Sequence, residues 1–325
     1  MLESETIRNT IVTDYSTSPG LRVSSRLTSL YERGKEQQWD TGTDLDWKVD
    51  SGFGSALQED SNFAIACFEA SPLARYGRPI WETFRWEFQS WMVSQFLPGE
   101  QAALLSANRL AAAVPDSEAR LCLSAQAVDE ARHVEVFERY LREKVPAPYP
   151  VSSSLALLLQ DTISDRRWDI NVLGMQILVE TVALAAFRLA DRSFHDKLIR
   201  EICRRVAQDE SRHVSFGVLT LSDLYADLPE SELKEREEFV IESLSLIRQR
   251  FLLEEIWDRM GIKRTEGIAF ATTSPLMIQY RQTICTNLIS SLIKIGLATH
   301  RLGDRLIHLN LLGARHRLWF SHAQR

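Results

Sequence analysis

The pattern of polar and apolar positions divides the chain into three parts. Residues 1–60 are polar and rich in turn-forming residues, and we expect them to form an arm or cap outside the main body. Residues 61–228 carry long apolar patterns at helical spacing, and helical patterns return over residues 229–325. This spacing is typical of helices that pack on one another, so it predicts an all-α fold. The expected organisation is an arm, a helical bundle and a C-terminal helical extension.

Prolines and polar clusters set the expected limits of the helices. Helices are expected over 61–113, about 117–144, about 168–191, about 196–226, about 231–259 and about 275–320. The first should be interrupted near Pro72 and Pro79, and its many aromatic residues are interpreted as core. Pro98 and Gly99 predict a kink or an opening in the same helix.

Residues 171–190 form an apolar stretch about as long as a membrane span. Gln176 and Glu180 lie in its middle, and a charge at the centre of a bilayer is costly. A helix buried inside a bundle explains both the apolar residues and the carboxylate. We therefore expect a core helix and no membrane span.

One six-residue motif occurs twice. Residues 129–134 read DEARHV and residues 209–214 read DESRHV, so each copy contains Glu-x-x-His. A further glutamate precedes the motif glutamate by 30 residues in both halves. Residues three apart on a helix share a face, so the glutamate and histidine of each motif point the same way. The six candidate metal ligands are Glu100, Glu130, His133, Glu180, Glu210 and His213.

The 30-residue spacing suits a helical hairpin whose two ligands lie at the same height. The turn of the first hairpin should fall near residues 114–117, where Pro115 and Asp116 stop one helix and cap the next. The turn of the second should fall near residues 191–195, and residues 146–150, with three prolines, should connect the hairpins. This is the arrangement of a four-helix bundle with a long crossover and a carboxylate-bridged two-metal centre. The alternative is that the Glu and His pairs lie on helix surfaces and never meet.

Four carboxylates and two imidazoles favour iron or manganese, with iron as the default. The set contains no cysteine, which argues against structural zinc and iron–sulfur clusters. Glu100 and Glu180 are the single contributions, and the two motifs supply the paired ones. The expected cofactor is two Fe ions, and a mixed Mn/Fe centre fits the same ligands.

An aspartate precedes the glutamate of each motif. Ligand histidines usually donate their second N–H to a carboxylate, so we expect Asp209 to hold His133 and Asp129 to hold His213. The alternative is an ordinary helix salt bridge from each aspartate to Arg132 or Arg212.

These residues resemble the ferritin-like di-iron oxygenase superfamily. It includes ribonucleotide reductase small subunits and related ligand-binding oxidases, multicomponent monooxygenase hydroxylases, acyl-carrier-protein desaturases and aminobenzoate-type N-oxygenases. Residues 99–103 (GEQAA) are similar to its first-glutamate helix, and the two motifs are similar to its Glu-x-x-His helices. The resemblance covers about residues 80–220. It implies a ferritin-like bundle, two metal ions, O2 as co-substrate and a homodimer.

At three positions the chain lacks an accessory residue that is typical of one group of that superfamily. Phe137 stands where radical-forming reductase subunits have a tyrosine, which argues against a stable tyrosyl radical. Leu184 stands where hydrocarbon hydroxylases have a threonine, and Val206 where the N-oxygenases have an extra histidine ligand.

Side chains one turn from the ligands should face the same interior and form the substrate pocket. They would make it largely apolar, with two amides, so a small apolar or aromatic substrate is expected. The candidates are Phe96, Gln126, Phe137, Gln176, Leu184, Val206 and Gly217.

The expected function is that of a di-iron oxygenase that activates O2 to N-oxygenate or hydroxylate a small organic substrate. No Gly-x-Gly-x-x-Gly fingerprint is present, so electrons should come from a separate reductase or ferredoxin. One alternative is a desaturase that acts on a carrier-bound acyl chain. Another is an iron-oxidising or storage protein, against which the arm and the C-terminal extension argue.

Charge and cysteine content indicate which partners and which cellular compartment to expect. The net charge is −6, which does not suggest a nucleic-acid partner. The four cysteines are scattered, and the N-terminus lacks the features of a signal peptide. Reduced thiols and a cytoplasmic location are expected.

Overall fold

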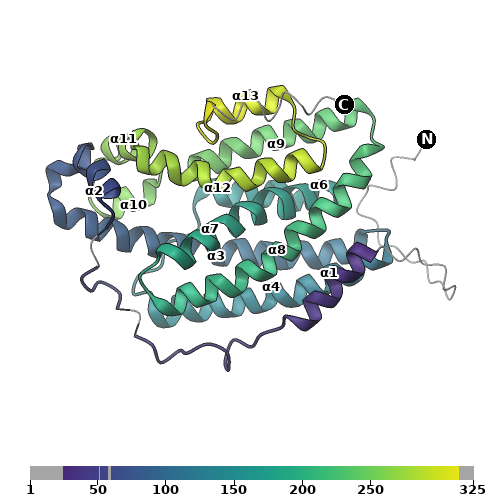
Figure 1. The fold of residues 1–325 in the computed structure, drawn as a ribbon, viewed down its shortest axis with the longest axis horizontal. Helices are drawn as coiled ribbons and strands as arrows, with labels where there is room; N and C mark the ends of the chain where they lie inside the picture. The colour runs from purple at the N-terminus through teal and green to yellow at the C-terminus, as the bar shows by residue number, and fades with distance from the viewer. Residues whose placement is uncertain (1–24, 51, 58–59, 315–325) are drawn as a thin grey trace.

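Four long helical rods form the centre of the molecule. The computed structural model describes residues 25–50, 52–57 and 60–314, and these residues form helices without any strand (Figure 1). The rods are α3 (Arg78–Ala113), α4 (Ser117–Lys144), the continuous α6–η2–α7 (Trp168–Ser193) and α8 (Lys197–Ala226). α3 pairs with α4 and α7 pairs with α8 as two hairpins. The predicted all-α bundle is confirmed.

An aspartate begins the second helix of each hairpin. Asp116 caps α4 by accepting a hydrogen bond from the backbone N–H of Ala119, at 2.7 Å. Asp196 caps α8 by accepting from the N–H of Leu198, at 2.8 Å. Such caps satisfy backbone donors that the first helical turn leaves free, and each contributes about 1 kcal/mol. The first turn lies where it was predicted, and α8 begins just after the second predicted turn.

The crossover between the hairpins contains a helix that the sequence analysis did not predict. α5 (Ser153–Ser164) follows the proline-rich segment and packs against α9 (Glu230–Arg250). Gln95 of α3 fixes its start, because its side-chain oxygen accepts from Ser152 N at 2.8 Å and its amide donates to Pro150 O at 2.9 Å. The crossover is therefore bound to the bundle at its beginning.

Irregular helical backbone occurs in the third rod. α3 continues through Pro98 without interruption, whereas Leu173–Val179 of η2 form a π-helix between α6 (Trp168–Val172) and α7 (Glu180–Ser193). A π-segment shifts the positions of the side chains that follow it, and such segments are frequent at functional sites. Here it ends directly before the candidate ligand Glu180.

The third rod is a core helix. Trp168–Ser193 is the one helix of the described residues long and apolar enough to cross a membrane, and 94% of its most apolar window is buried inside the protein. The expectation of a buried helix agrees with this placement.

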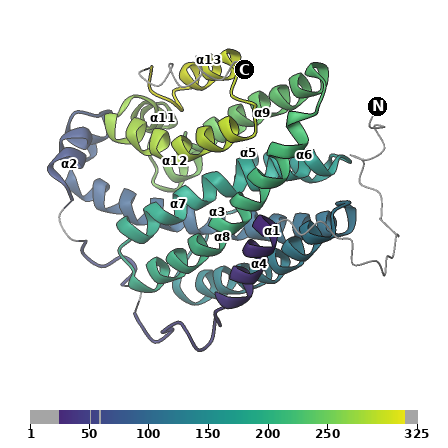
Figure 2. The same ribbon diagram turned by 45° about the vertical axis from the view of Figure 1, so that its right-hand side comes forward.

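The N-terminal helix α1 (Ser25–Glu36) lies across α4 and α8 on the side away from the C-terminal helices (Figures 1 and 2). The arm therefore packs on the bundle of its own chain. Residues 1–24 of the predicted arm lie outside the described residues.

The C-terminal helices form a second layer over the bundle (Figure 1). Beyond α9 they are α10 (Glu254–Arg259), α11 (Arg264–Thr273), α12 (Pro275–Lys294), which packs on α7, and α13 (His300–His308). The prediction of one helix over 231–259 is wrong, and the helical region expected over about 275–320 contains two helices, α12 and α13. Leu253 (φ 57°) and Gly296 (φ 79°) have left-handed backbone conformations, which end a helix. Leu253 separates α9 from α10, and Gly296 separates α12 from α13. The part of the second predicted helix beyond residue 314 lies outside the described residues.

Two short elements, α2 (Asn62–Glu69) and η1 (Pro72–Tyr76), precede α3 and match the predicted interruptions. The aromatic side chains of this region are buried, as expected for core. Phe84 stacks on Trp257 of α10, with ring centroids 5.2 Å apart and planes 8° apart. This cluster joins the start of α3 to the C-terminal layer.

Candidate metal centre

The six candidate ligands meet in the middle of the bundle, and all are buried. Their donor atoms form two groups, each with all its atoms within 4.8 Å of one another. One group is Glu100, Glu130, His133 and Glu210, and the other is Glu130, Glu180, Glu210 and His213. Two glutamates therefore belong to both groups, and each group has one glutamate and one histidine of its own. The alternative of isolated surface pairs does not describe this structure.

Both histidines turn the same ring nitrogen toward the carboxylates. Nδ1 of His133 lies 3.2 Å from Glu100, 3.1 Å from Glu130 and 3.3 Å from Glu210. Nδ1 of His213 lies 3.1 Å from Glu130 and 3.6 Å from Glu210. The i,i+3 spacing places each histidine beside its motif glutamate, and the equal hairpin arms bring the two motifs to one height.

The other ring nitrogen of each histidine faces an aspartate of the opposite motif. Nε2 of His133 lies 3.1 Å from Asp209, and Nε2 of His213 lies 3.2 Å from Asp129. These are the cross-bundle pairs that the sequence suggested. A carboxylate in this position orients the ring and leaves Nδ1 as the free donor atom.

The two motif arginines complete a charge-balanced quartet with the same aspartates. Arg132 contacts Asp129 at 2.5 Å and Asp209 at 3.3 Å, while Arg212 contacts Asp209 at 2.7 Å and Asp129 at 3.0 Å. The helix salt bridges considered as an alternative are thus present together with the histidine contacts. Each aspartate supports a histidine and is itself held by two guanidinium groups.

Three residues that the sequence analysis missed close this quartet from outside. They follow α1, and they reach motif residues that lie more than 90 positions away. The indole N–H of Trp39 donates to Asp209 at 2.8 Å, and the amide of Gln38 donates to Asp129 at 3.1 Å. Gln37 accepts from Arg212 at 2.8 Å. The sequence offered one signal, which is the presence of Trp39 in a polar segment. Tryptophan is usually buried, and a buried indole N–H needs a hydrogen-bond acceptor.

Two glutamines of the bundle interior adjoin the cluster. The amide of Gln126 donates to Glu130 at 3.1 Å and to Glu180 at 2.9 Å. The amide of Gln176 lies 3.5 Å from the side-chain oxygen of Gln126. Gln126 therefore orients two candidate ligands, and it lines a small hollow beside His213 rather than the apolar cavity described below.

Burial and mutual contact set the protonation of the cluster. Burial raises the pKa of Glu100 and of Glu180 well above the usual value, and repulsion by the other glutamates adds to this effect. Burial acts the same way on Glu130, but the two imidazoles hold the pKa of Glu130 below its usual range. For His133 and His213 burial opposes protonation, yet the surrounding carboxylates raise each pKa well above the usual value. Both effects reduce the negative charge of the cluster when no cation is bound.

The residues fit a pair of divalent cations. Buried atoms without a hydrogen-bond partner include Oε2 of Glu180, Oε2 of Glu210 and Nδ1 of His213, which lies near Glu130 without hydrogen-bond geometry. Orphaned buried donors and acceptors of this kind are costly unless a ligand satisfies them. The four glutamate carboxylates would offset the four positive charges of two divalent ions, and the two imidazoles would be neutral ligands.

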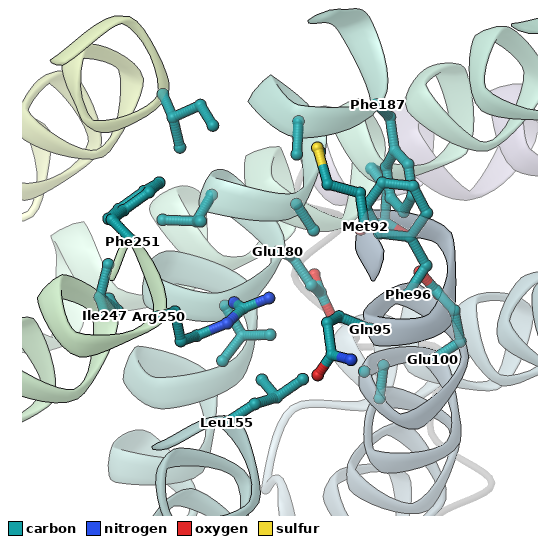
Figure 3. Close-up of a pocket in the computed structure, with 18 of the residues that line it drawn as sticks. Met92, Gln95, Phe96, Glu100, Leu155, Glu180, Phe187, Ile247, Arg250 and Phe251 are labelled. Atoms are coloured by element: carbon teal, nitrogen blue, oxygen red, sulfur yellow. The ribbon is translucent and has the colours of Figure 1, made fainter. Parts of the chain in front are cut away.

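An apolar cavity adjoins the cluster on the side of the C-terminal layer (Figure 3). Glu100, Glu180 and Glu210 contribute to its wall. Its other walls come from α3, α5, α7, α12 and the end of α9, and they include Met92, Phe96, Leu155, Phe187, Ile247, Phe251 and Ile284. A substrate in this cavity would contact the candidate ligands directly and be shielded from water.

Of the seven predicted pocket residues, Phe96 lines this cavity. The others lie in the packed interior: Phe137 packs face to face on Phe187 with centroids 5.7 Å apart, and Leu184 and Val206 are buried core. Gly217 packs against Gln176, since a Cβ at Gly217 would lie 2.7 Å from the Cβ of Gln176. Side chains one turn from the ligands fill the bundle axis, so the cavity opens between the bundle and its outer layer instead.

Known structures share this fold. No protein-family model matches the chain, and no match was found among curated proteins. The chain is similar to an R2-like ligand-binding oxidase with an aerobically reconstituted Mn/Fe cofactor, at 16% identity and a TM-score of 0.62 over 88% of this chain and 98% of that one. It is also similar to a mutant of such an oxidase with an anaerobically reconstituted Mn/Fe cofactor, at 16% identity and a TM-score of 0.61 over 88% and 99%. These similarities show a ferritin-like fold.

Proposed function

We propose that this protein is an O2-dependent dimetal oxidoreductase that hydroxylates or N-oxygenates a small, mainly apolar organic substrate. The observation that carries the proposal is the pair of ligand groups that share Glu130 and Glu210 beside an apolar cavity. A shared pair of carboxylates is what two adjacent cations require, and an apolar wall is what an organic substrate requires.

Each ion would have its own ligands in addition to the shared ones. Glu100 and His133 would hold one ion, and Glu180 and His213 would hold the other. Oxygen and imidazole donors suit two iron ions or a mixed manganese–iron pair. The similar structures named above carry a Mn/Fe cofactor, which supports the same assignment. When bound, such a pair supplies reduction of O2 and oxidation of the substrate.

The protein's own side chains would position the ions and keep the site dry. The aspartate–arginine quartet fixes both imidazole rings, and Gln126 fixes two of the carboxylates. The wall residues Phe96 and Phe187, with ring centroids 4.5 Å apart, exclude water beside the cluster. A preorganised, water-free site of this kind directs oxidation toward the bound substrate.

Electrons would come from a separate reductase or ferredoxin, because the sequence carries no nucleotide fingerprint of its own. Iron storage is the less favoured function, since storage needs no apolar cavity at the ligands.

The test starts from metal-free protein. Ferrous iron is titrated anaerobically, O2 is added and visible absorption is followed. We expect about two irons per chain and an absorption change that requires both. Glu130→Ala removes a shared ligand and should abolish the change, whereas Glu138→Ala, an exposed glutamate of the same helix, should not. A wild-type protein that binds no iron, or that takes up many irons per chain, would refute the proposal.

A further inference from the structure

The cavity contains a cation without an ion-pair partner in the described part of the chain. Arg250, the last residue of α9, lines the cavity, and Figure 3 shows its guanidinium reaching inward from the side opposite Glu100. The side chain is partly buried, and its Nε is buried without a hydrogen-bond partner. Among the described residues, no carboxylate forms an ion pair with it.

Two other buried arginines in this chain are satisfied. Arg236 is paired with Asp169 at 3.0 Å. Arg281 donates to three backbone oxygens, at 2.7 Å to Ala271, 2.8 Å to Thr272 and 3.1 Å to Asn310. Arg132, Arg248 and Arg305 each keep one buried nitrogen without a partner, but each also makes a hydrogen bond or an ion pair. Arg250 differs from all of these, because its guanidinium makes no hydrogen bond or ion pair within the described residues and lines the cavity.

Two of the other polar groups of the cavity are already engaged. The amide of Gln95 is used at both ends by the crossover, and the hydroxyl of Tyr280 donates to the sulfur of Met92 at 3.3 Å. The glutamates of the wall belong to the metal cluster. The indole N–H of Trp91 also lacks a partner, but it carries no charge. Arg250 is therefore the cationic donor of this wall that an anionic ligand can satisfy.

The backbone holds Arg250 in place. Phe251 N donates to Arg248 O at 3.2 Å and Leu252 N donates to Gln249 O at 2.9 Å, which ends α9 tightly. Leu253 follows in the left-handed region, at φ 57°. Burial lowers the pKa of the Arg250 guanidinium, as expected for a cation kept from water without a counter-ion. A poorly solvated guanidinium on a well-held backbone is a strong site for an anion.

We propose that Arg250 binds the carboxylate of an organic acid, whose apolar body extends across the cavity toward Glu100 and Glu180. The inference names the substrate class of the function proposed above and rests on it. A guanidinium presents a planar fork of donors that matches a carboxylate, and the apolar walls accept the rest of the molecule. The acid group would mark one end of the substrate, and the carbon or nitrogen to be oxidised would lie at the other.

The test compares phenylacetate with phenylacetamide, a neutral molecule of nearly the same shape. Binding to metal-loaded protein is measured by calorimetric titration. Wild type should bind the acid more tightly than the amide. Arg250→Gln should weaken acid binding roughly ten- to hundredfold and leave amide binding little changed, since a charged hydrogen-bond pair is lost. Arg250→Lys keeps the charge but lacks the planar pair of donors, so its affinity for the acid should lie between those of wild type and Arg250→Gln.

Arg248→Gln is the matched control, because Arg248 lies on the same helix turn and donates to Leu309 O outside the cavity. It should bind both compounds like wild type. Wild-type protein that binds the acid no more tightly than the amide, or an unchanged affinity in Arg250→Gln, would overturn the inference.

A second titration, on metal-free protein, separates this inference from the proposed function. If the acid sits on Arg250, the effect of Arg250→Gln persists without metal. If acid binding needs metal and ignores Arg250, the carboxylate sits on the ions, and the inference is wrong although the proposed function stands. Iron uptake by Arg250→Gln is measured in parallel and should equal that of wild type. If wild-type protein took up no iron, the proposed function would be refuted. Acid binding that depends on Arg250 would still stand in that case.

Discussion

At the scale of single residues, Asp209 joins three parts of the chain through one carboxylate. It faces Nε2 of His133, accepts from the indole of Trp39 and pairs with Arg132 and Arg212. Because it orients a candidate ligand, Asp209→Ala should weaken iron binding about tenfold or more. The affinity is measured by anaerobic titration, with folding checked by circular dichroism.

The control for this prediction is Asp223→Ala. Asp223 is an exposed aspartate of the same helix and should not affect iron binding. Equal affinity in Asp209→Ala and wild type would show that the carboxylate does not position His133.

His195 gives the protein a pH-dependent stability that is independent of the cluster. Its ring packs edge-on against Trp86, with centroids 5.5 Å apart, and burial followed by the nearby Arg85 lowers its pKa to about 4. The unfolded chain takes up this proton near pH 6.5, whereas the folded protein does so only near pH 4. The free energy of unfolding should therefore fall as the pH is lowered from 6.5 toward 4.

His195→Gln should reduce that fall, and chemical denaturation at several pH values measures it. His300→Gln removes an exposed histidine and serves as the control. If both variants lose stability with falling pH as wild type does, His195 is not the source.

The sequence revealed the candidate ligands because their spacing repeats within each half of the bundle. The six residues can be found from two sequence spacings, 30 residues and three residues, without knowing which distant segments are in contact. Trp39 and Arg250 carry no such signal, since their roles depend on segments that meet the cluster only in the folded protein. Of the seven predicted pocket residues, Phe96 lines the apolar cavity, and the others do not for a related reason: a helix face that points inward can be filled as readily as it can be hollow.

At the scale of elements, the π-helix of the third rod depends on close packing with α5. Gly174 lies in the π-segment, and a Cβ there would meet Thr162 Cγ2 at 2.5 Å and Oγ1 at 2.6 Å. Thr162 is β-branched and cannot easily move away. Gly174→Ala should therefore lower the free energy of unfolding by about 1–3 kcal/mol, measured by denaturant unfolding of metal-free protein.

Gly99→Ala is the matched control for this prediction. Gly99 is also helical, and a Cβ there would meet nothing within 4 Å. Alanine at that position should be neutral or stabilise the protein by up to about 1 kcal/mol. A stable Gly174→Ala protein would mean that α5 can move aside.

Caps and ligand motifs located most of the bundle helices from the sequence. Features that depend on packing against another helix were not predicted. Asp116 and Pro115 mark a turn wherever they stand, so the first hairpin could be located from sequence. α5 also has its own cap, since Ser152 accepts from Leu155 N, but its segment was interpreted as part of the connection between the hairpins. The π-segment packs closely on α5, and no local pattern marks that segment or the break at Leu253. These features are consequences of packing between layers.

At the scale of the whole molecule, the metal centre should contribute to folding. Its six candidate ligands come from all four rods, so an ion held there connects both hairpins. A ligand that binds only the folded state at a hundredfold excess over its Kd stabilises that state by about 2.7 kcal/mol per site. The unfolding entropy of a 325-residue chain is about 0.7 kcal/mol/K, so one occupied site should raise the Tm by roughly 4 °C and two sites by roughly 8 °C.

Differential scanning calorimetry with and without anaerobic ferrous iron measures this rise, and a chelator should reverse it. Glu130→Ala removes a ligand shared by both ion positions, so its Tm should respond to iron much less than that of wild type. Glu138→Ala, exposed on the same helix, should respond like wild type. If iron left the Tm of wild type unchanged, the four rods would be held by their apolar contacts alone, and the cluster would not bind ions in the folded protein.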